Sequence, residues 1–220
     1  MNNIIAIDGP ASSGKSSLAK KISNYYGSPL LNSGKLYRAV AFQVQNENIN
    51  INDKSSITKI AKSLTDVDLN SKKLFSSEID RISSKISAKK YLRDLLKIYQ
   101  REFSKKYHKY KKYVIIEGRD IGTEIFPDAK YKIFLWADAK IRAMRRYEQI
   151  KKKGQKAYLS TLYKEIIERD NKDLNRKIAP LKPAANSVLL DTSYLDIEQT
   201  FNAIKIILKN KYETRVYRSK

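Results

Sequence analysis

The sequence contains no cysteine, and it has only one histidine and one tryptophan. Without cysteine the chain can form no disulfide, no thiolate metal site and no thiol nucleophile. The histidine, His108, lies in a basic and tyrosine-rich stretch at 105–112, where we expect it to face solvent and to take no part in catalysis. The tryptophan, Trp136, lies in an apolar run, which favours a place in the core over a base-stacking role.

Long apolar runs are also absent. No stretch is long enough to cross a bilayer as a helix, and the first residues lack the basic-then-apolar pattern of a secretory signal. We therefore expect a soluble protein of the cytoplasm, with no membrane partner. A length of 220 residues suits one domain, or a domain with a subdomain, and is enough to bury a sizeable core.

Acidic residues are scarce relative to basic ones. There are 23 Asp and Glu residues against 45 Lys and Arg residues, which gives a formal net charge of +22. Such a field attracts polyanions, including nucleic acids and nucleotides. Because the lysines are spread along the whole chain, we interpret most of the charge as solvated lysine faces. Binding of single-stranded nucleic acid by the lysine- and tyrosine-rich stretch 107–113 stays open but is not favoured.

The most informative stretch that is present lies near the start of the chain. Residues 9–16, with the sequence GPASSGKS, match the phosphate-binding loop G-x4-G-K-[ST] in full. The apolar run 4–7 before it is typical of a buried strand, and residues 18–25 after it have helical periodicity. Strand, glycine-rich loop and helix together form the context that this motif requires.

The residue types of this loop indicate its chemistry. Gly9 and Gly14 let the backbone turn tightly and bring its N–H groups against anionic oxygens at a helix N-terminus. Lys15 can reach the β- and γ-phosphates of a nucleotide, and the Ser16 hydroxyl can ligate Mg²⁺. The residues that we expect to hold the phosphates are Gly9, Pro10, Ala11, Ser12, Ser13, Gly14, Lys15, Ser16 and Ser17.

Strand and helix patterns alternate along the rest of the chain. We expect strands at 4–7, 30–31, 113–116, 131–137 and 187–190, and helices at 18–25, 33–46, 55–64, 78–87, 91–107, 139–152, 159–173 and 197–208. Ser33 and Gly154 are the expected N-cap and C-cap of two of these helices. Residues 66–77 look irregular, and 209–220 form a basic tail that we expect to fray.

This alternation predicts an α/β fold, with a mostly parallel sheet covered by helices on both faces. In such folds, ligands bind at the carboxyl ends of the strands. The phosphate loop, the turn at 117–120 and the turn after 137 all lie at such ends. We therefore expect them to surround one cleft.

Three polar clusters supply further candidate site residues. They are 33–38, where Tyr37 and Arg38 follow Ser33 by one helical turn; 118–120; and 168–176. Each cluster alone is also explained by helix capping or by a solvated charged face. Beside a phosphate loop they indicate phosphoryl transfer, because spread negative charge needs several cations. Arg38, Arg119, Arg169 and Arg176 could supply these cations, and Asp8 and Glu117 could hold Mg²⁺ through water or only fix loop geometry.

Four stretches of the chain resemble bacterial cytidylate kinases. They are residues 9–16, 32–38, 117–129 and 169–185, and the resemblance extends from about residue 4 to residue 208. The resemblance implies the P-loop nucleoside-monophosphate kinase fold, in which a parallel sheet flanked by helices carries a small monophosphate-binding insertion and a mobile lid. It divides the single kinase domain 1–220 into a core (1–38, 91–154 and 187–208), an insertion (about 39–90), a lid (about 155–186) and the tail 209–220.

The resemblance also implies an activity and roles for residues. The γ-phosphate of ATP would pass to CMP or dCMP with the help of Mg²⁺, and the enzyme would be a monomer. Asp120 resembles the carboxylate that accepts a hydrogen bond from the cytosine amino group, which is sound chemistry for favouring cytosine over uracil. The implied substrate-binding residues are Ser33, Tyr37, Arg38, Ser84, Arg93, Arg119, Asp120, Arg169, Asp173 and Arg176, and the implied catalytic residues are Lys15, Arg119, Arg169 and Arg176.

The chain also departs from the family pattern. Where the family carries Ile-Arg, this chain has Ile79-Asp80, with Arg81 displaced by one residue. Three alternatives to a cytidylate kinase stay open at this point. They are a kinase for another monophosphate such as UMP, AMP or dTMP, an NTPase stimulated by nucleic acid, and a partner protein that only binds nucleotide.

Overall fold

The computed structural model describes residues 3–209, apart from the side chains of residues 67 and 72. The chain divides into two compact units, one made of residues 1–30 and 107–220 and the other of residues 31–106. The expected tail 209–220 lies outside the described residues except for Lys209, which ends the last helix.

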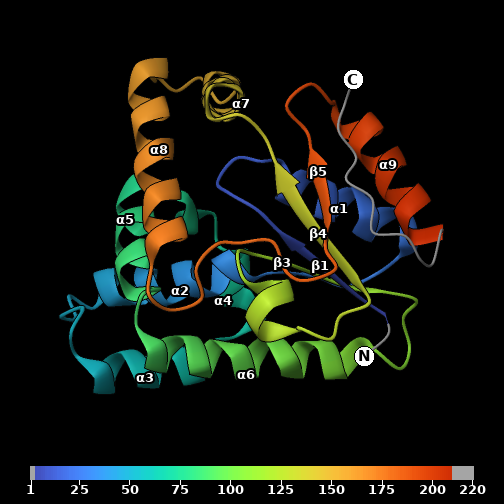
Figure 1. Cartoon of the computed structure of the whole chain (residues 1–220). Coiled ribbons are helices and arrows are strands. Elements are labelled where there is room, and N and C mark those ends of the chain that lie inside the picture. Colours follow the sequence, from blue (N-terminus) through green and yellow to red (C-terminus); the bar gives the residue numbers. More distant parts are fainter. Residues whose placement is uncertain (1–2, 210–220) are drawn as a thin grey trace. The chain divides into compact units, whose positions relative to one another are not determined.

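The first unit is built on a parallel sheet. Its strands are β1 (Ile4–Asp8), β3 (Val114–Glu117), β4 (Tyr131–Trp136) and β5 (Val188–Asp191), and β2 (Leu30–Asn32) is the strand at which the chain passes into the second unit. The strand order is β2-β3-β1-β4-β5, and β1 pairs in parallel with both β3 and β4. The expected fold class is confirmed, and β1 lies in the middle of the sheet (Figure 1).

Helices cover this sheet because its strands are apolar on both faces. All five residues of β1 are buried. Ile5 and Ile7 belong to one hydrophobic cluster with residues of α1 (Lys15–Tyr26) and α9 (Ile197–Lys209), so these two helices cover one face of the sheet. The remaining helices of the unit are α7 (Ala139–Lys151), α8 (Leu159–Asn175) and a π-helical turn, η2 (Ile121–Ile125), which the sequence did not predict.

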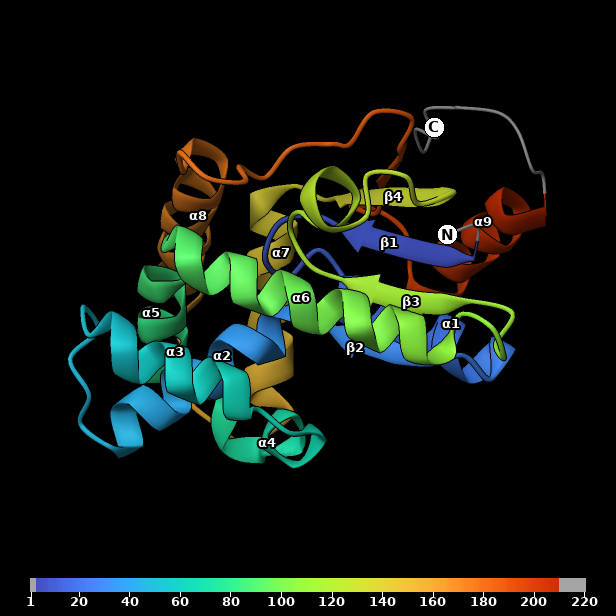
Figure 2. The same cartoon turned by 90° about the horizontal axis from the view of Figure 1, so that it is seen from below.

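The second unit is helical. It contains α2 (Ser33–Asn46), α3 (Lys54–Ser63), α4 (Asp66–Asn70), the 3₁₀ turn η1 (Lys72–Phe75), α5 (Ser77–Ile86) and most of α6 (Lys90–Tyr107). Helix α2 contacts α3, α4, α5 and η1, and is the element around which this unit packs (Figure 2). Leu36, Val40 and Ile79 are buried on α2 and α5.

Several local expectations were wrong. Residues 66–77 are not irregular, since they form α4, η1 and the start of α5. The Asp68 carboxylate accepts a hydrogen bond from the Thr65 backbone N–H at 2.8 Å and so caps α4. Asn32, not Ser33, caps α2, since its Oδ1 accepts from the Lys35 N–H at 3.1 Å. The expected Gly154 cap of α7 is confirmed, since Gly154 has a φ of +71° and the N–H groups of Gly154 and Gln155 donate to the Lys151 carbonyl at 2.9 Å and the Ile150 carbonyl at 3.3 Å.

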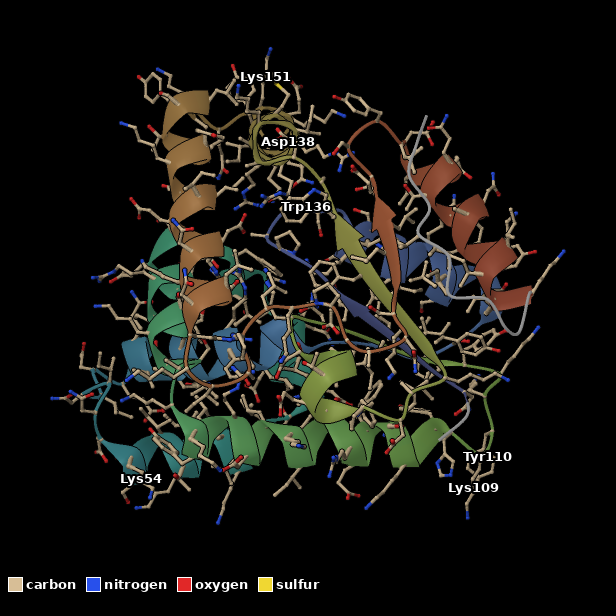
Figure 3. The ribbon with its side chains drawn as sticks, viewed as in Figure 1. Lys54, Lys109, Tyr110, Trp136, Asp138 and Lys151 are labelled. Atoms are coloured by element: carbon tan, nitrogen blue, oxygen red, sulfur yellow. The ribbon has the colours of Figure 1, made fainter. Side chains whose placement is uncertain are left out.

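The two rare aromatic residues also differ from expectation. Trp136 is not in the core: its side chain is 45% exposed at the last residue of β4, near Asp138 (Figure 3). Its ring centroid lies 5.8 Å from the guanidinium carbon of Arg142. His108 is half-buried and not fully solvent-facing, and its backbone carbonyl accepts a hydrogen bond from the Asn3 side chain at 2.9 Å.

Within residues 3–209, no helix has both the length and the apolar character needed to cross a membrane. This finding agrees with the short apolar runs of the sequence.

Candidate functional site

The phosphate loop lies between β1 and α1, as its motif requires. Gly9 has a φ of +148°, and a Cβ at this position would lie 2.2 Å from the carbonyl oxygen of Leu135, so only glycine fits. Two side chains from outside the loop donate hydrogen bonds to its carbonyl groups. Arg142 Nη1 donates to the Ala11 carbonyl at 3.1 Å, and Thr192 Oγ1 donates to the Ser13 carbonyl at 3.3 Å.

Lys15 begins α1 and lies buried within the loop. Its Nζ donates to the Pro10 carbonyl at 2.6 Å and to Ser13 Oγ at 3.3 Å. Burial lowers the pKa of Lys15 well below its ordinary value, and the positive charge of Arg119 lowers it further. An anionic group beside this amine would favour its charged form, so the amine suits phosphate.

Two acidic residues at the carboxyl ends of β1 and β3 have different surroundings. Asp8 is buried and accepts hydrogen bonds from the backbone N–H groups of Ile121 (2.8 Å) and Gly122 (2.7 Å), which fixes the π-helical turn η2. Burial raises the pKa of Asp8 to about 6, although the two backbone hydrogen bonds oppose the shift. These contacts favour the loop-fixing role of Asp8 over a role in holding Mg²⁺.

Glu117 lies next to the hydroxyl group expected to bind the metal. Ser16 Oγ donates to Glu117 Oε2 at 3.0 Å. Hydroxyl and carboxylate oxygens are the hard ligands that Mg²⁺ prefers, so this pair fits the ion. No group of three or more His, Cys, Asp or Glu side chains that could hold a metal ion occurs in the described part of the chain.

Three arginines surround one buried carboxylate, Asp173. Arg119 Nε donates to Asp173 Oδ2 at 3.1 Å; the Arg169 Nε lies 3.8 Å from the same oxygen, and Arg176 Nη1 lies 3.7 Å from Oδ1. Burial alone would raise the pKa of Asp173, but the three positive charges outweigh it and hold the pKa below its ordinary value. Asp173 and the three arginines, all candidate site residues from the sequence, therefore lie together in the fold.

A second buried ion pair was missed by the sequence reasoning. Arg142 of α7 is only 1% exposed, and its guanidinium donates to Asp170 of α8 at 2.6 Å and to the Ala137 carbonyl at 2.8 Å. Together with its bond to Ala11, this contact joins α8 to the phosphate loop and to the end of β4. Nothing in the local sequence distinguishes Arg142 from the neighbouring Arg145 and Arg146, so only the fold reveals it.

The expected monophosphate-binding residues lie in the second unit. Ser33 is buried at the start of α2, and Tyr37 and Arg38 follow it by one turn. Arg93 of α6 is buried, its guanidinium carbon lies 5.7 Å from the Tyr37 ring centroid, and its Nη1 donates to the Ser87 carbonyl. Ser84 is half-buried on α5.

Arg38 has a set of partners that the sequence reasoning did not foresee. Its Nη1 donates to the Leu74 carbonyl at 2.9 Å, and its Nη2 forms an ion pair with Asp80. Its guanidinium carbon also lies 5.2 Å from the Phe75 ring centroid. The sequence feature that could have indicated the ion pair is Asp80, which departs from the family pattern.

The predicted site residues therefore fall into two groups, each within one unit. Lys15, Ser16, Arg119, the buried Asp120, Arg169, Asp173 and Arg176 belong to the first unit, and Ser33, Tyr37, Arg38, Ser84 and Arg93 belong to the second. The single cleft expected from the sequence stays a prediction.

Comparison with known proteins identifies the family. A family model described as cytidylate kinase matches residues 5–210. The chain belongs to the cytidylate kinase family. The cytidylate kinase of Bartonella tribocorum is 41% identical over 198 residues, which cover 90% of each chain. That of Bradyrhizobium sp. is 39% identical over 91% of this chain and 92% of its own, and that of Bartonella henselae is 38% identical over 97% of each chain.

Solved structures of more distant proteins show the same fold. An uncharacterized protein from Eubacterium ventriosum has a TM-score of 0.54 at 15% identity and covers 94% of this chain and 99% of its own. A protein from Thermus thermophilus has a TM-score of 0.52 at 14% identity, with coverage of 94% and 98%. At such low identity this likeness concerns the fold alone.

The raised pKa of Asp8 predicts a pH-dependent contribution to stability. Since the folded pKa of about 6 exceeds the ordinary value of 3.8, the folded state keeps a proton that the unfolded state releases. As the pH rises from about 4 to about 6, wild type should lose stability relative to Asp8→Asn, by at most about 1.4 kcal/mol per pH unit. Urea unfolding across this range measures the difference.

The matched control is Asp128→Asn at an exposed position, which should leave the pH dependence of wild type unaltered. A constant difference in unfolding free energy between wild type and Asp8→Asn across the range contradicts the assignment.

Proposed function

We propose that this protein transfers the γ-phosphate of ATP to CMP or dCMP, giving ADP and CDP or dCDP. The observation that carries the proposal is the arginine cluster around Asp173 in the unit that also holds a complete phosphate loop. The charges of Arg119 and Asp173 both shift the pKa of Lys15, so the cluster lies within electrostatic reach of the loop. Membership of the cytidylate kinase family supports the choice of acceptor.

The loop residues from Gly9 to Ser17 hold the phosphates of ATP. Their backbone N–H groups and the N-terminus of α1 contact the anionic oxygens, while the Lys15 amine leaves its own loop carbonyl for the β- and γ-phosphates. Ser16 and Glu117 would hold Mg²⁺ through their hydroxyl and carboxylate oxygens. When bound, Mg²⁺ neutralises charge on the phosphates.

Lys15, Arg119, Arg169 and Arg176 stabilise the transferred phosphoryl group. The transition state spreads negative charge over the equatorial oxygens, so positioned cations lower its energy without any covalent intermediate. Asp173 keeps the three guanidinium groups oriented and also binds the acceptor. Positioning and electrostatics thus account for the catalysis.

The acceptor is recognised through its phosphate and its base. Ser33, Tyr37 and Arg38, with Ser84 and Arg93, bind the monophosphate. Asp120 accepts a hydrogen bond from the cytosine 4-amino group, whereas uracil presents a carbonyl oxygen that the carboxylate repels.

The parts of the kinase domain 1–220 have separate tasks in this proposal. Residues 39–90 form the acceptor-binding insertion, and 155–186 form a lid that closes over the core and excludes water from the reaction. The Arg142–Asp170 pair anchors the lid helix α8 to the core. We expect the enzyme to act as a monomer in the cytoplasm.

The test is coupled ADP production with ATP and Mg²⁺ against CMP, dCMP, UMP, AMP, GMP and dTMP in turn. Strong turnover with CMP and dCMP alone supports the proposal. Turnover with another monophosphate keeps the kinase and overturns the specificity. Absence of turnover with all six, together with ATP hydrolysis stimulated by RNA or DNA and weakened by salt, would favour the NTPase alternative.

Asp120→Asn tests the assigned base contact. The amide can present an N–H to the uracil carbonyl, so the CMP-to-UMP ratio of kcat/KM should fall by roughly tenfold to a hundredfold, the range that one base-reading contact controls. The exposed Asp128→Asn should keep the wild-type ratio. An unchanged ratio in Asp120→Asn counts against the contact.

A further inference from the structure

We propose that Asp80 is a built-in competitor of the acceptor phosphate, because its carboxylate holds the guanidinium of Arg38. Asp80 would thereby determine the affinity of this enzyme for nucleoside monophosphates. The inference rests on the proposed function, in which Arg38 binds the phosphate of CMP. It goes further by giving the chain an affinity-determining residue that does not itself bind substrate.

Both terminal nitrogens of the Arg38 guanidinium have partners. Nη1 donates to the Leu74 carbonyl at 2.9 Å, Nη2 pairs with Asp80, and the guanidinium carbon lies 5.2 Å from the Phe75 ring centroid. A two-pronged contact with phosphate uses neighbouring N–H groups of the same planar fork. A phosphate at Arg38 must therefore displace Asp80 or lie beside its negative charge, and both cost affinity.

The ion pair is partly buried, which strengthens it. The side chains of Arg38 and Asp80 are 20% and 27% exposed. Charges at this depth are screened less by water and salt than a fully exposed pair. The pair is thus strong enough to compete with a ligand while remaining within reach of solvent.

The position of Asp80 is fixed by the fold of the second unit. Asp80 lies in the first turn of α5, where the helix dipole favours a negative charge, and Ser76 caps this turn by accepting from the Ile79 N–H at 3.2 Å. The neighbouring Ile79 is buried, and α5 packs against α2, which carries Arg38. The carboxylate and the guanidinium therefore face each other across two helices that are held together by apolar packing.

This arrangement selects for strong anions. A phosphate monoester with two negative charges can replace a carboxylate at a guanidinium, whereas a ligand with a weaker or single charge gains less from Arg38 than it loses from Asp80. Asp80 would lower affinity for every ligand and lower it most for those without a phosphate monoester.

The test compares Asp80→Asn with wild type in steady-state kinetics at saturating ATP. Loss of the competing charge should lower the KM for CMP by about three- to tenfold, the range of a partly exposed ion pair, with kcat and the KM for ATP unchanged. A merely structural pair would instead change kcat, melting temperature and both KM values together. An unchanged or raised KM for CMP in a folded Asp80→Asn protein overturns the proposal.

Two matched variants sharpen the result. Glu78→Gln removes an exposed charge from the same helical turn and should leave the KM for CMP at the wild-type value. Asp80→Asn in an Arg38→Gln background should also have no effect on that KM, because Asp80 acts only through Arg38. A drop in KM in either protein means that the effect is one of net charge and overturns the proposal.

A measurement on the wild-type chain covers the case in which Asp80→Asn does not fold. The side-chain carboxyl carbon of Asp80 should shift in NMR spectra on addition of CMP, since Arg38 leaves it for phosphate. An unchanged resonance at saturating CMP overturns the proposal. If wild type neither binds nor phosphorylates CMP, the proposed function fails as well, whereas normal CMP turnover with an unshifted Asp80 refutes this inference alone.

Discussion

The site of the first unit depends on one buried carboxylate, that of Asp173. Arg119, Arg169 and Arg176 carry like charges that would repel one another and Lys15 if no anion lay between them. Burial lowers the pKa of Lys15, and the positive charge of Arg119 lowers it further. Because the pKa of Asp173 lies below its ordinary value, its stabilising effect is present above that value and is lost as the pH falls through the folded pKa.

The second unit uses the same kind of contact with a different balance of charge. Asp173 lies among three arginines, so its cluster keeps a surplus of positive charge for phosphate, whereas the single Arg38 is matched by the single Asp80. The first arrangement gathers cations and still attracts an anion. The second makes an incoming phosphate compete for its partner. In the first unit the carboxylate orients the arginines before a nucleotide binds, whereas in the second unit Arg38 must give up its carboxylate partner.

Local pattern was enough to predict the strands, most helices and the phosphate loop, because each depends on neighbouring residues. Sequence also predicted that Asp173 and its arginines belong to the site, through their resemblance to a known family. It could not give the partners of Asp8, which lie 113 and 114 residues away, or the Arg142–Asp170 pair, since such contacts exist only after the sheet has formed. Trp136 was misplaced because an apolar strand pattern does not show which of its residues other elements of the fold cover.

The most direct test of this account is the pKa of Asp173 itself, read from the pH titration of its carboxyl carbon by NMR in the full chain and assigned with Asp173→Asn. The account predicts a value below 3.8, because three guanidinium groups outweigh the effect of burial. A value at or above 3.8 would mean that the arginines do not gather around this carboxylate, and it would contradict the central claim about how the site is organised.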